Sequence, residues 1–430
     1  MIVDSDCASR EATSALPLMP RGVVSQIPSP TSGCSASAPC ERCRSDQDSL
    51  RNFNCPADSD GGFKITVADL YAGCGGMTLG LYEASQRYNY QLRVSLAVDS
   101  DRGALGIYQL NFPSANTRVA DLAEVFDGLV GSSPTASECK IMEEFGETDV
   151  LVGGPPCQGH SDLNNYTRRD DPKNALYLRM ARAAEILLPK VVVIENVATV
   201  HLDKNGVVQA TLQALEACGY RVATKILDLR RIGVPQRRRR FLLIATTITR
   251  LDPSTVLSNL EKSMPDHPDR TVRWAIEDLR SIHGNTTYDS SSRTSEKNAK
   301  RIDLLFDRNL YDLPNRFRPK CHREKDHSYI SMYGRLRWAS PAQTITTGFG
   351  SMGQGRYVHP KCRRTITPHE AARLQTFPDW FRFGEAPRGV LASVIGNAVP
   401  PLLMREVGAA IFPAIVEARE ALSEKIRKRA

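Results

Sequence analysis

The chain has 430 residues, 41% of them hydrophobic and 24% charged, which is usual for a water-soluble globular protein with one large and one smaller domain. Its net charge of +8 is a weak indication of a nucleic-acid partner, because many basic proteins bind none. The eleven cysteines are not spaced as in a small disulfide-rich secreted protein, and the sequence does not begin with an apolar signal segment. The most apolar stretch, residues 184–200, is interrupted by Lys190, Glu195 and Asn196. We therefore expect a cytoplasmic protein without a membrane partner.

Residues 1–62 are rich in Ser, Pro, Ala and Asp and show no sustained periodicity, so we expect a flexible N-terminal extension. The segment includes cysteines at positions 34, 40, 43 and 55. The pair Cys40 and Cys43 has the spacing of half a zinc site, but the flanking spacings match no zinc motif. A disordered tail that happens to contain cysteines is the alternative.

An alternation of strand-like and helix-like segments begins at Lys64. β-Branched runs occupy residues 65–70, 94–98, 150–152, 191–194 and 241–246, and helical patterns occupy 174–188 and 206–218. Leu176, Met180, Ala184 and Leu187 are spaced to share one helix face. Strands alternating with helices predict a doubly wound, mostly parallel α/β sheet.

The alternation stops near residue 251, and a polar, irregular stretch follows as far as about residue 334. We then expect a strand at 344–346, a helix starting at 368–374 and a long helix from about Pro401. The predicted organisation is therefore an extension (1–62), an α/β domain (63–250), a small inserted region (251–334) and the remainder of the α/β domain (335–430).

A glycine-rich turn follows the first strand. Gly73, Gly75 and Gly76 stand where the strand must turn sharply into a helix, and glycine there lets backbone approach a ligand. A tight structural turn is the alternative. The next two strand ends carry Asp99 and Asp121, and carboxylates at such ends can hold ribose hydroxyls. Together they predict an adenosine-type site, and the absence of a Lys after the glycines disfavours a nucleoside triphosphate.

The fourth strand leads into Gly-Gly-Pro-Pro-Cys-Gln, which ends in Cys157 and Gln158. Two prolines fix the backbone on the approach to the thiol, at the edge of the sheet where ligands bind. A buried, unreactive cysteine is the commoner fate of a lone Cys, but this context favours a nucleophile.

Together, these blocks resemble the cytosine-C5 DNA methyltransferase family. The resemblance rests on Asp-Leu-Tyr-Ala-Gly-Cys-Gly-Gly at 69–76, Gly-Pro-Pro-Cys-Gln at 154–158, Glu-Asn-Val at 195–197, Gln-Arg-Arg-Arg-Arg at 236–240 and Gly-Asn-Ala-Val at 396–399. It covers roughly residues 64–250 and 333–403. The resemblance implies a class I methyltransferase fold, S-adenosylmethionine as methyl donor and duplex DNA as substrate.

The resemblance also implies roles for individual residues. Cys157 would add to C6 of cytosine, Glu195 would act at N3, and Arg238 would hold O2, with Gln236 and Arg240 supporting them. On an alternating strand Arg238 and Arg240 share a face with Gln236, whereas Arg237 and Arg239 face the other way. The implied cofactor residues are Tyr71, Gly73, Gly75, Gly76, Asp99, Asp121, Asn397 and Ala398. Tyr71 replaces the family's more usual Phe, and Asp99 its more usual Glu.

Simpler interpretations remain open for the residues expected to assist Cys157. Glu195 and Asn196 could cap a helix, and the arginine run could be a phosphate-facing patch. The segment 158–169 is the candidate loop for filling the space of a flipped base. Within residues 251–334, which stand where the family keeps its target-recognition region, basic and aromatic residues fit DNA contact or ordinary solvated surface: Tyr311, Arg316, Phe317, Arg318, Lys320, His322, Arg323 and Tyr329.

Two rival functions differ in class. One is an RNA cytosine-C5 methyltransferase of the same fold, and the other is a DNA-binding regulator without catalysis. The long recognition region argues against the first, and the intact Cys157, Glu195, Gln236 and Arg238 argue against the second. We expect a monomer without a bound metal, although Cys321, His322 and His327 contain ligand-type side chains. A cognate restriction endonuclease is a plausible functional partner.

Overall fold

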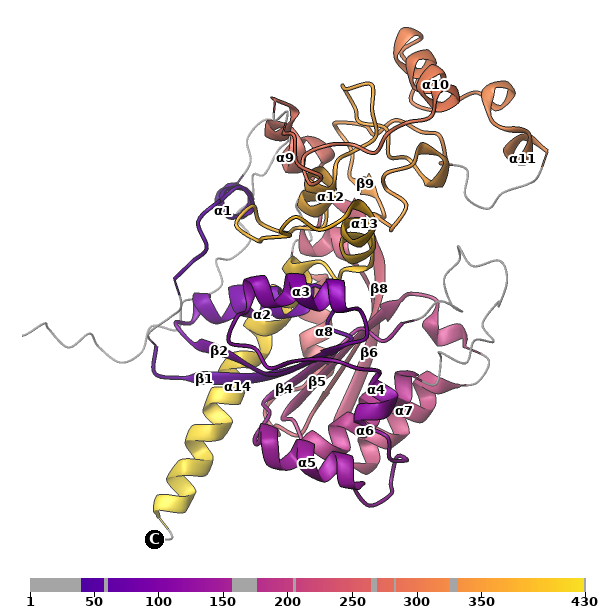
Figure 1. Ribbon diagram of the computed structural model, residues 1–430. Helices are drawn as coiled ribbons and strands as arrows, with labels where there is room; N and C mark the ends of the chain where they lie inside the picture. The colour runs from indigo at the N-terminus through magenta and orange to yellow at the C-terminus, as the bar shows by residue number, and fades with distance from the viewer. Residues whose placement is uncertain are drawn as a thin grey trace, which may run out of the picture.

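The computed structural model describes residues 40–57, 61–156, 176–203, 206–263, 269–281, 284–324 and 331–428 (Figure 1). Within these ranges the main sheet has seven strands in the order β3-β2-β1-β4-β5-β8-β6. They are β1 (Lys64–Leu70), β2 (Gln91–Asp99), β3 (Thr117–Val119), β4 (Val150–Gly153), β5 (Val191–Val197), β6 (Arg221–Asp228) and β8 (Arg239–Thr246). The first five are parallel, and β8 runs antiparallel to β5 and β6. The predicted mostly parallel α/β sheet is confirmed.

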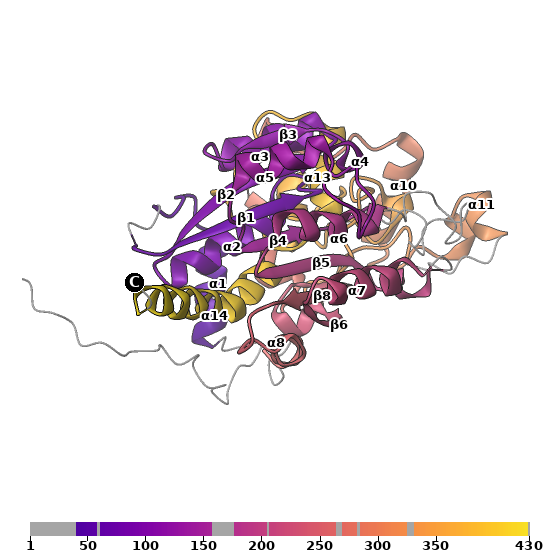
Figure 2. The ribbon, with the colours of Figure 1, turned by 90° about the horizontal axis from the view of Figure 1, so that it is seen from below.

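Helices cover both faces of this sheet (Figures 1 and 2). Those packed on its core are α2 (Gly76–Arg87), α8 (Pro253–Glu261) and α14 (Pro401–Arg427) on one face, and α4 (Leu122–Val125), α5 (Ala136–Phe145), α6 (Leu176–Leu187) and α7 (Val207–Ala217) on the other. The helix α3 (Arg102–Asn111) packs beside β2 and β3. The helical patterns expected at 174–188, 206–218 and from Pro401 correspond to α6, α7 and α14.

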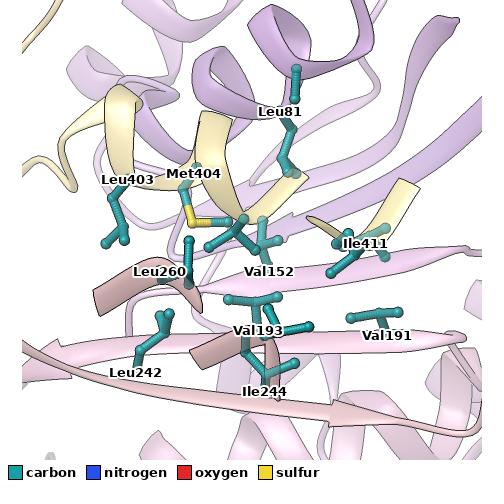
Figure 3. Close-up of a cluster of buried hydrophobic side chains, with 14 of the residues drawn as sticks. Leu81, Val152, Val191, Val193, Leu242, Ile244, Leu260, Leu403, Met404 and Ile411 are labelled. Atoms are coloured by element: carbon teal, nitrogen blue, oxygen red, sulfur yellow. The ribbon is translucent and has the colours of Figure 1, made fainter. Parts of the chain in front are cut away.

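Alternation along the strands explains the two hydrophobic layers. Val191 and Val193 face the α14 side, whereas Val192 and Ile194 face the α6 side. Since successive side chains of a strand point to opposite faces, a continuous apolar run fits a strand buried on both faces. Figure 3 shows the first layer, where Met404 of α14 lies over Val152 and Val193.

The helix α14 packs closely on α2, although the two are far apart in sequence (Figure 2). A Cβ atom at Gly80 of α2 would lie 2.1 Å from the carbonyl oxygen of Pro401 and 2.6 Å from Met404 Cβ. Further along, Arg419 of α14 pairs with Asp149 at 2.6 Å, next to the start of β4. The C-terminal helix is therefore built into the sheet domain.

A second layered region lies beyond the carboxyl ends of the strands (Figure 1). One of its clusters joins α9 (Val272–Ile276), α12 (Pro368–Leu374) and α13 (Arg388–Asn397) to side chains of α2 and α3. Another joins α10 (Glu296–Asp307) to residues between Leu313 and Val358. The short helix α11 (Lys320–Arg323) lies near its outer end. Packing thus crosses the boundaries expected at 251 and 334, because α8 belongs to the sheet core and Met352 and Val358 pack with α10.

The N-terminal helix α1 (Glu41–Leu50) corrects the expectation of a flexible extension over residues 1–62. Cys43, Asp46 and Leu50 are buried, and Asp46 forms ion pairs with Arg270 (2.5 Å) and Arg405 (2.6 Å). Leu50 also accepts a backbone hydrogen bond from Asp379. The composition of the segment could not reveal these partners, because all of them lie more than 200 residues downstream.

The strand expected at 344–346 was wrong. A small parallel pair instead joins β7 (Gln236–Arg237) to β9 (Ala342–Gln343). The strand pairing ends at Gln343 because the side-chain oxygen of Gln236 accepts a hydrogen bond from the backbone N–H of Ile345 at 3.1 Å. In the part of the chain described, no single helix has the length and apolarity needed to cross a membrane; only the bent pair α13–α14 meets those two criteria jointly.

Candidate active site

The carboxyl ends of β1, β2, β4 and β5 meet at one edge of the sheet. Leu70 is in register with Val98 and with Gly153, and Gly153 is in register with Ile194. Parallel strands therefore deliver Tyr71, Asp99, Gly154 and Glu195 to the same edge, where open α/β sheets bind ligands.

The glycine turn after β1 has the conformation that its sequence predicts. Gly73 has φ +55° and Gly75 has φ +94°, both in the left-handed region. A carboxylate oxygen of Asp99 accepts the N–H of Gly73 at 2.8 Å, which fixes the turn against the end of β2. A Cβ atom at Gly73 would meet nothing within 4 Å, so the turn is open on that side. The turn can therefore admit a ligand close to its backbone.

The C-terminal block lies against the same turn. A Cβ atom at Gly76 would lie 2.6 Å from the carbonyl oxygen of Val399 and 3.7 Å from Ala398 Cβ. Asn397, at the end of α13, is exposed, and its Nδ2 is 3.5 Å from Ser393 Oγ. Asp121 is also exposed and caps α4 by accepting the N–H of Ala123 at 2.8 Å. The structure thus brings Ala398 to the glycine turn, while Asn397 and Asp121 present side chains to solvent.

A buried network beneath the turn was missed by the sequence analysis. Thr78 donates to Asp69 at 2.7 Å, and its hydroxyl is also 2.7 Å from the Tyr108 hydroxyl. Burial raises the pKa of the Asp69 carboxyl to about 8, so this carboxyl is largely protonated at neutral pH. Its Oδ1 has no hydrogen-bond partner among the described residues. The position of Asp69 within the glycine block was the available signal, but its role depends on residues 9 and 39 positions away.

Cys157 and the segment 158–169 lie outside the described residues, but the approach to Cys157 is defined. Asn196 donates from Nδ2 to the carbonyl oxygen of Pro155 at 3.2 Å. A Cβ atom at Gly154 would lie 3.7 Å from Glu195 Oε2. The Gly-Gly-Pro-Pro segment therefore runs alongside Glu195 and Asn196, which places the start of the nucleophile segment next to β5.

Glu195 forms an ion pair with Arg240, with 2.8 Å between Oε1 and Nε. The exposed fraction is 9% for the Glu195 side chain and 14% for that of Arg240, so both are reachable from the edge of the sheet without being free in solvent. Register explains the contact, since Arg240 of β8 lies opposite Val197 of β5, and Glu195 shares a strand face with Val197. A carboxylate and a guanidinium are thus held side by side next to the Pro155 segment.

Arg238 occupies a different environment. Its side chain is buried, and its guanidinium donates to the carbonyl oxygens of Ile345 (3.1 Å) and Ala398 (3.0 Å). Burial, together with the positive charge of Arg240, lowers its pKa well below the usual value for arginine. Arg238 therefore connects β8 to the backbone at Ile345 and at Ala398. Arg240, rather than Arg238, is the arginine that pairs with Glu195.

Gln236 is a buried connector. Its Nε2 donates to the Leu374 carbonyl at 2.9 Å and to Gln375 Oε1 at 2.7 Å, while its Oε1 accepts the Ile345 N–H. Gln236 and Arg238 are buried, and Arg237 and Arg239 are exposed, as strand alternation predicts. Alternation identified the shared face, but it could not identify which arginine meets Glu195.

The outer part of the second region carries the expected basic and aromatic residues. Arg316, Lys320 and Arg323 are exposed. The guanidinium of Arg316 lies 4.9 Å from the centre of the Phe317 ring, and that of Arg337 lies 4.2 Å from the centre of the Tyr311 ring. Arg318 donates to the Leu313 carbonyl, His322 is half-buried, and Tyr329 and His327 lie outside the described residues. Aromatic rings thus hold some of these arginines against the protein surface.

No group of three or more metal-ligating side chains occurs in the described ranges. Cys40 acts as the N-cap of α1, where its sulfur accepts the N–H of Cys43 at 3.4 Å. Cys321 is exposed on α11.

Residues 65–413 match the family described as C-5 cytosine-specific DNA methylase. The Type II methyltransferase M1.BsuMI of Bacillus subtilis strain 168 is 42% identical over 358 residues, which cover 83% of this chain and 83% of that protein. The Type II methylase M.HgiDII of Herpetosiphon aurantiacus is 31% identical, covering 80% of this chain and 94% of that protein.

Solved structures agree with these sequence matches. A prophage-encoded protein of E. coli, described as a DNA modification methyltransferase, has a TM-score of 0.57 and 25% identity, covering 82% of this chain and 99% of that one. Dnmt2 of S. pombe has a TM-score of 0.56, 17% identity and similar coverage, and it supports the fold alone. The matches favour DNA over RNA as the substrate. The chain belongs to the C-5 cytosine-specific DNA methylase family and is a DNA (cytosine-5-)-methyltransferase.

Proposed function

We propose that this enzyme methylates C5 of a flipped-out cytosine in duplex DNA through a covalent bond between Cys157 and C6, with S-adenosylmethionine as methyl donor. The observation that carries the proposal is the ion pair between Glu195 and Arg240 beside the Pro155 segment that leads to Cys157. The Type II relatives further support a role as the modification enzyme of a restriction–modification system. We propose that it acts as a monomer.

The glycine turn fits the donor. Gly73 is open on its ligand side, Asp99 holds the turn, and Asp69 Oδ1 is a buried oxygen without a described hydrogen-bond partner beneath it. Tyr71, Gly73, Gly75, Gly76, Asp99, Asp121, Asn397 and Ala398 would hold S-adenosylmethionine at this edge. When bound, it supplies an electrophilic methyl group.

The chain's own residues activate the base. The Cys157 thiolate would form a bond to C6, which makes C5 nucleophilic. Glu195 would hydrogen-bond N3 and supply a proton as charge develops on the ring, and Arg240 would stabilise that charge at O2. Arg238 and Gln236 would keep β8 in register with residues 345 and 398 rather than touch the base. Loss of the C5 proton then releases Cys157.

Base-resolution mapping of 5-methylcytosine tests the proposal. The full chain and its Cys157→Ala variant would be expressed in a methylation-free bacterial host, and the genomic DNA mapped. We expect methylation within one short sequence for the native chain and none for the variant. Methylation by soluble Cys157→Ala would refute the covalent role. A blank map from soluble native chain would refute DNA as the substrate, and tRNA would then be the material to assay.

A further inference from the structure

A cavity of about 470 Å³ lies in the second region of the molecule. Three segments form most of its lining: residues 292–298 at the start of α10, the loop 347–354 and the first residues of α13. Arg293 and Thr347 line the cavity and are exposed, so it is open to solvent. Its volume lies within the range of roughly 300–1,000 Å³ that is usual for small-ligand sites. The cavity is therefore large enough to hold a ligand.

Close packing holds the walls of this cavity together. A Cβ atom at Gly350 would lie 2.4 Å from Ser292 Oγ, so only glycine lets the loop meet the start of the α10 segment. The buried Thr365 donates from its hydroxyl to the Gly350 carbonyl at 3.3 Å. On the α13 side, the Arg388 guanidinium donates to the carbonyl oxygen (2.7 Å) and to the Oγ (2.9 Å) of Ser290. The cavity is thus a defined feature of the fold, and Arg388 is fixed in its wall.

The lining is basic and rich in hydroxyl groups. Arg293 and Arg388 belong to it, whereas no aspartate or glutamate of the described ranges does. The Arg293 guanidinium has neither an ion pair nor a hydrogen bond to a described residue, and the same is true of the hydroxyls of Ser292, Thr294 and Ser351. A cation beside several hydroxyl donors, with no carboxylate to compete, suits a group that carries negative charge and accepts hydrogen bonds. A phosphate has both properties.

The cavity adjoins the catalytic edge. A Cβ atom at Gly396 would lie 2.2 Å from the backbone nitrogen of Thr347, so this part of the lining packs directly on α13. Thr347 is two residues after Ile345 and Gly396 is two residues before Ala398, and the carbonyl oxygens of Ile345 and Ala398 are the two that Arg238 binds. A phosphate in the cavity would therefore lie beside the catalytic edge, close to the DNA that presents the target base.

We infer that this cavity binds a phosphodiester group of the duplex DNA, with Arg293 as its main cation and the unpartnered hydroxyls as donors. Phosphate contacts fix the position of a protein on a duplex without reading its sequence. The cavity would thus hold the DNA at a set position relative to Glu195 and Arg240. This inference rests on the proposed function, because it takes duplex DNA as the substrate.

The test measures binding of a fluorescently labelled duplex of arbitrary sequence to the full chain, by anisotropy at several salt concentrations. One lost phosphate contact reduces the slope of log Kd against log salt by about 0.9, and we expect this change for Arg293→Gln. The same change corresponds to a Kd about tenfold weaker near 0.1 M salt. Ser351→Ala removes a neutral donor, so it should weaken Kd by about threefold and leave the slope unchanged.

Lys297→Gln is the matched control. Lys297 is exposed on α10 and does not line the cavity, so this variant removes the same charge nearby and should keep the native slope. The thermal unfolding midpoint of Arg293→Gln should equal that of the native chain, because Arg293 has no described partner to lose. This midpoint separates a lost DNA contact from misfolding.

Three results would overturn the inference. Arg293→Gln could keep the native slope, or Lys297→Gln could lose as much as Arg293→Gln. Alternatively, inorganic phosphate titrated by calorimetry could bind the native chain but not Arg293→Gln, with DNA binding unchanged, which would assign the cavity to a free phosphate. A native slope in Arg293→Gln together with a positive methylation map refutes the cavity alone, whereas a blank map refutes the proposed function whatever the slope.

Discussion

Two sets of buried charges in this molecule are built differently. Where α1 meets α9 and α14, each carboxylate oxygen of Asp46 has its own arginine partner. At the edge of the sheet, Asp69 Oδ1 and Arg238 Nε lack partners among the described residues, and Glu195 shares a single ion pair with Arg240. Paired buried charges stabilise a packing arrangement, whereas incompletely satisfied ones remain available to a ligand. The first set therefore predicts effects on stability, and the second predicts effects on catalysis.

The largest expected effect distinguishes the roles of Arg238 and Arg240. Arg240→Ala should lower the single-turnover methylation rate by about a thousandfold, because it removes the cation beside Glu195 at the developing charge.

Arg238→Ala should instead lower the unfolding midpoint, since it leaves the carbonyl groups of Ile345 and Ala398 without their donor. The opposite result would be an Arg238→Ala variant that is fully stable but inactive and an Arg240→Ala variant that stays active. That result would return the contact with O2 of the base to Arg238, as the sequence analysis predicted.

The α1 junction should show the opposite behaviour. Asp46→Ala removes the carboxylate that pairs with the buried Arg270 and Arg405 and leaves Arg405 with its ion pair to Glu406, which should lower the free energy of unfolding by about 3 kcal/mol. Methylation per folded molecule should be retained. The exposed Asp48→Ala on the same helix is the control and should change stability little. Equal unfolding curves for the two variants would show that the junction is not a stability element.

Asp69 gives a prediction about pH. Burial raises its pKa in the fold to about 8 from the usual 3.8 of an aspartate, so its contribution to stability is complete below about pH 4 and is lost as pH rises through 8. Asp69→Asn cannot ionise and should be more stable than the native chain at pH 8 by about 2 kcal/mol. Glu83, with its pKa raised to about 7, titrates in both proteins, so the difference between the two urea-unfolding pH profiles isolates Asp69. Parallel profiles would contradict a protonated Asp69.

The smallest expected effect concerns the cap of α1. Sulfur is a weak acceptor, and a serine hydroxyl is a better N-cap group. Cys40→Ser should therefore raise the free energy of unfolding by about 0.5 kcal/mol. Thermal unfolding at several scan rates would measure the change, and a loss of stability would show that the thiol has a further role.

Sequence predicted the features that depend on short-range patterns. β-Branched runs and helical spacing predicted β1, β2, β4, β5, β8, α6 and α7, because burial on one or two faces imposes those periods. The glycine turn was also predicted, since it depends on consecutive residues, whereas Cys157 lies outside the described residues and its position stays a prediction. Gln236 and Arg238 were predicted to share a buried face, and the structure agrees.

What the sequence could not predict depends on partners distant in the chain. The segment around Asp46 has the composition of a disordered tail, and only Arg270 and Arg405 make it a buried helix. Whether Arg238 or Arg240 lies beside Glu195 depends on the register of β8 against β5, which no local sequence pattern encodes. The end of β9 likewise depends on a side chain more than 100 residues upstream, Gln236.

The interlocking of α2 with α14 also has a consequence for biosynthesis. The glycine turn is translated before Val399, which lies against Gly76, and before Pro401, which lies against Gly80. Until α14 is made, a nascent chain would expose the apolar face of β1, β4 and α2 that α14 later covers. The glycine turn is therefore supported only once α14 has been added, so a chain truncated before α14 would be a target for chaperones and proteases rather than a weak methyltransferase.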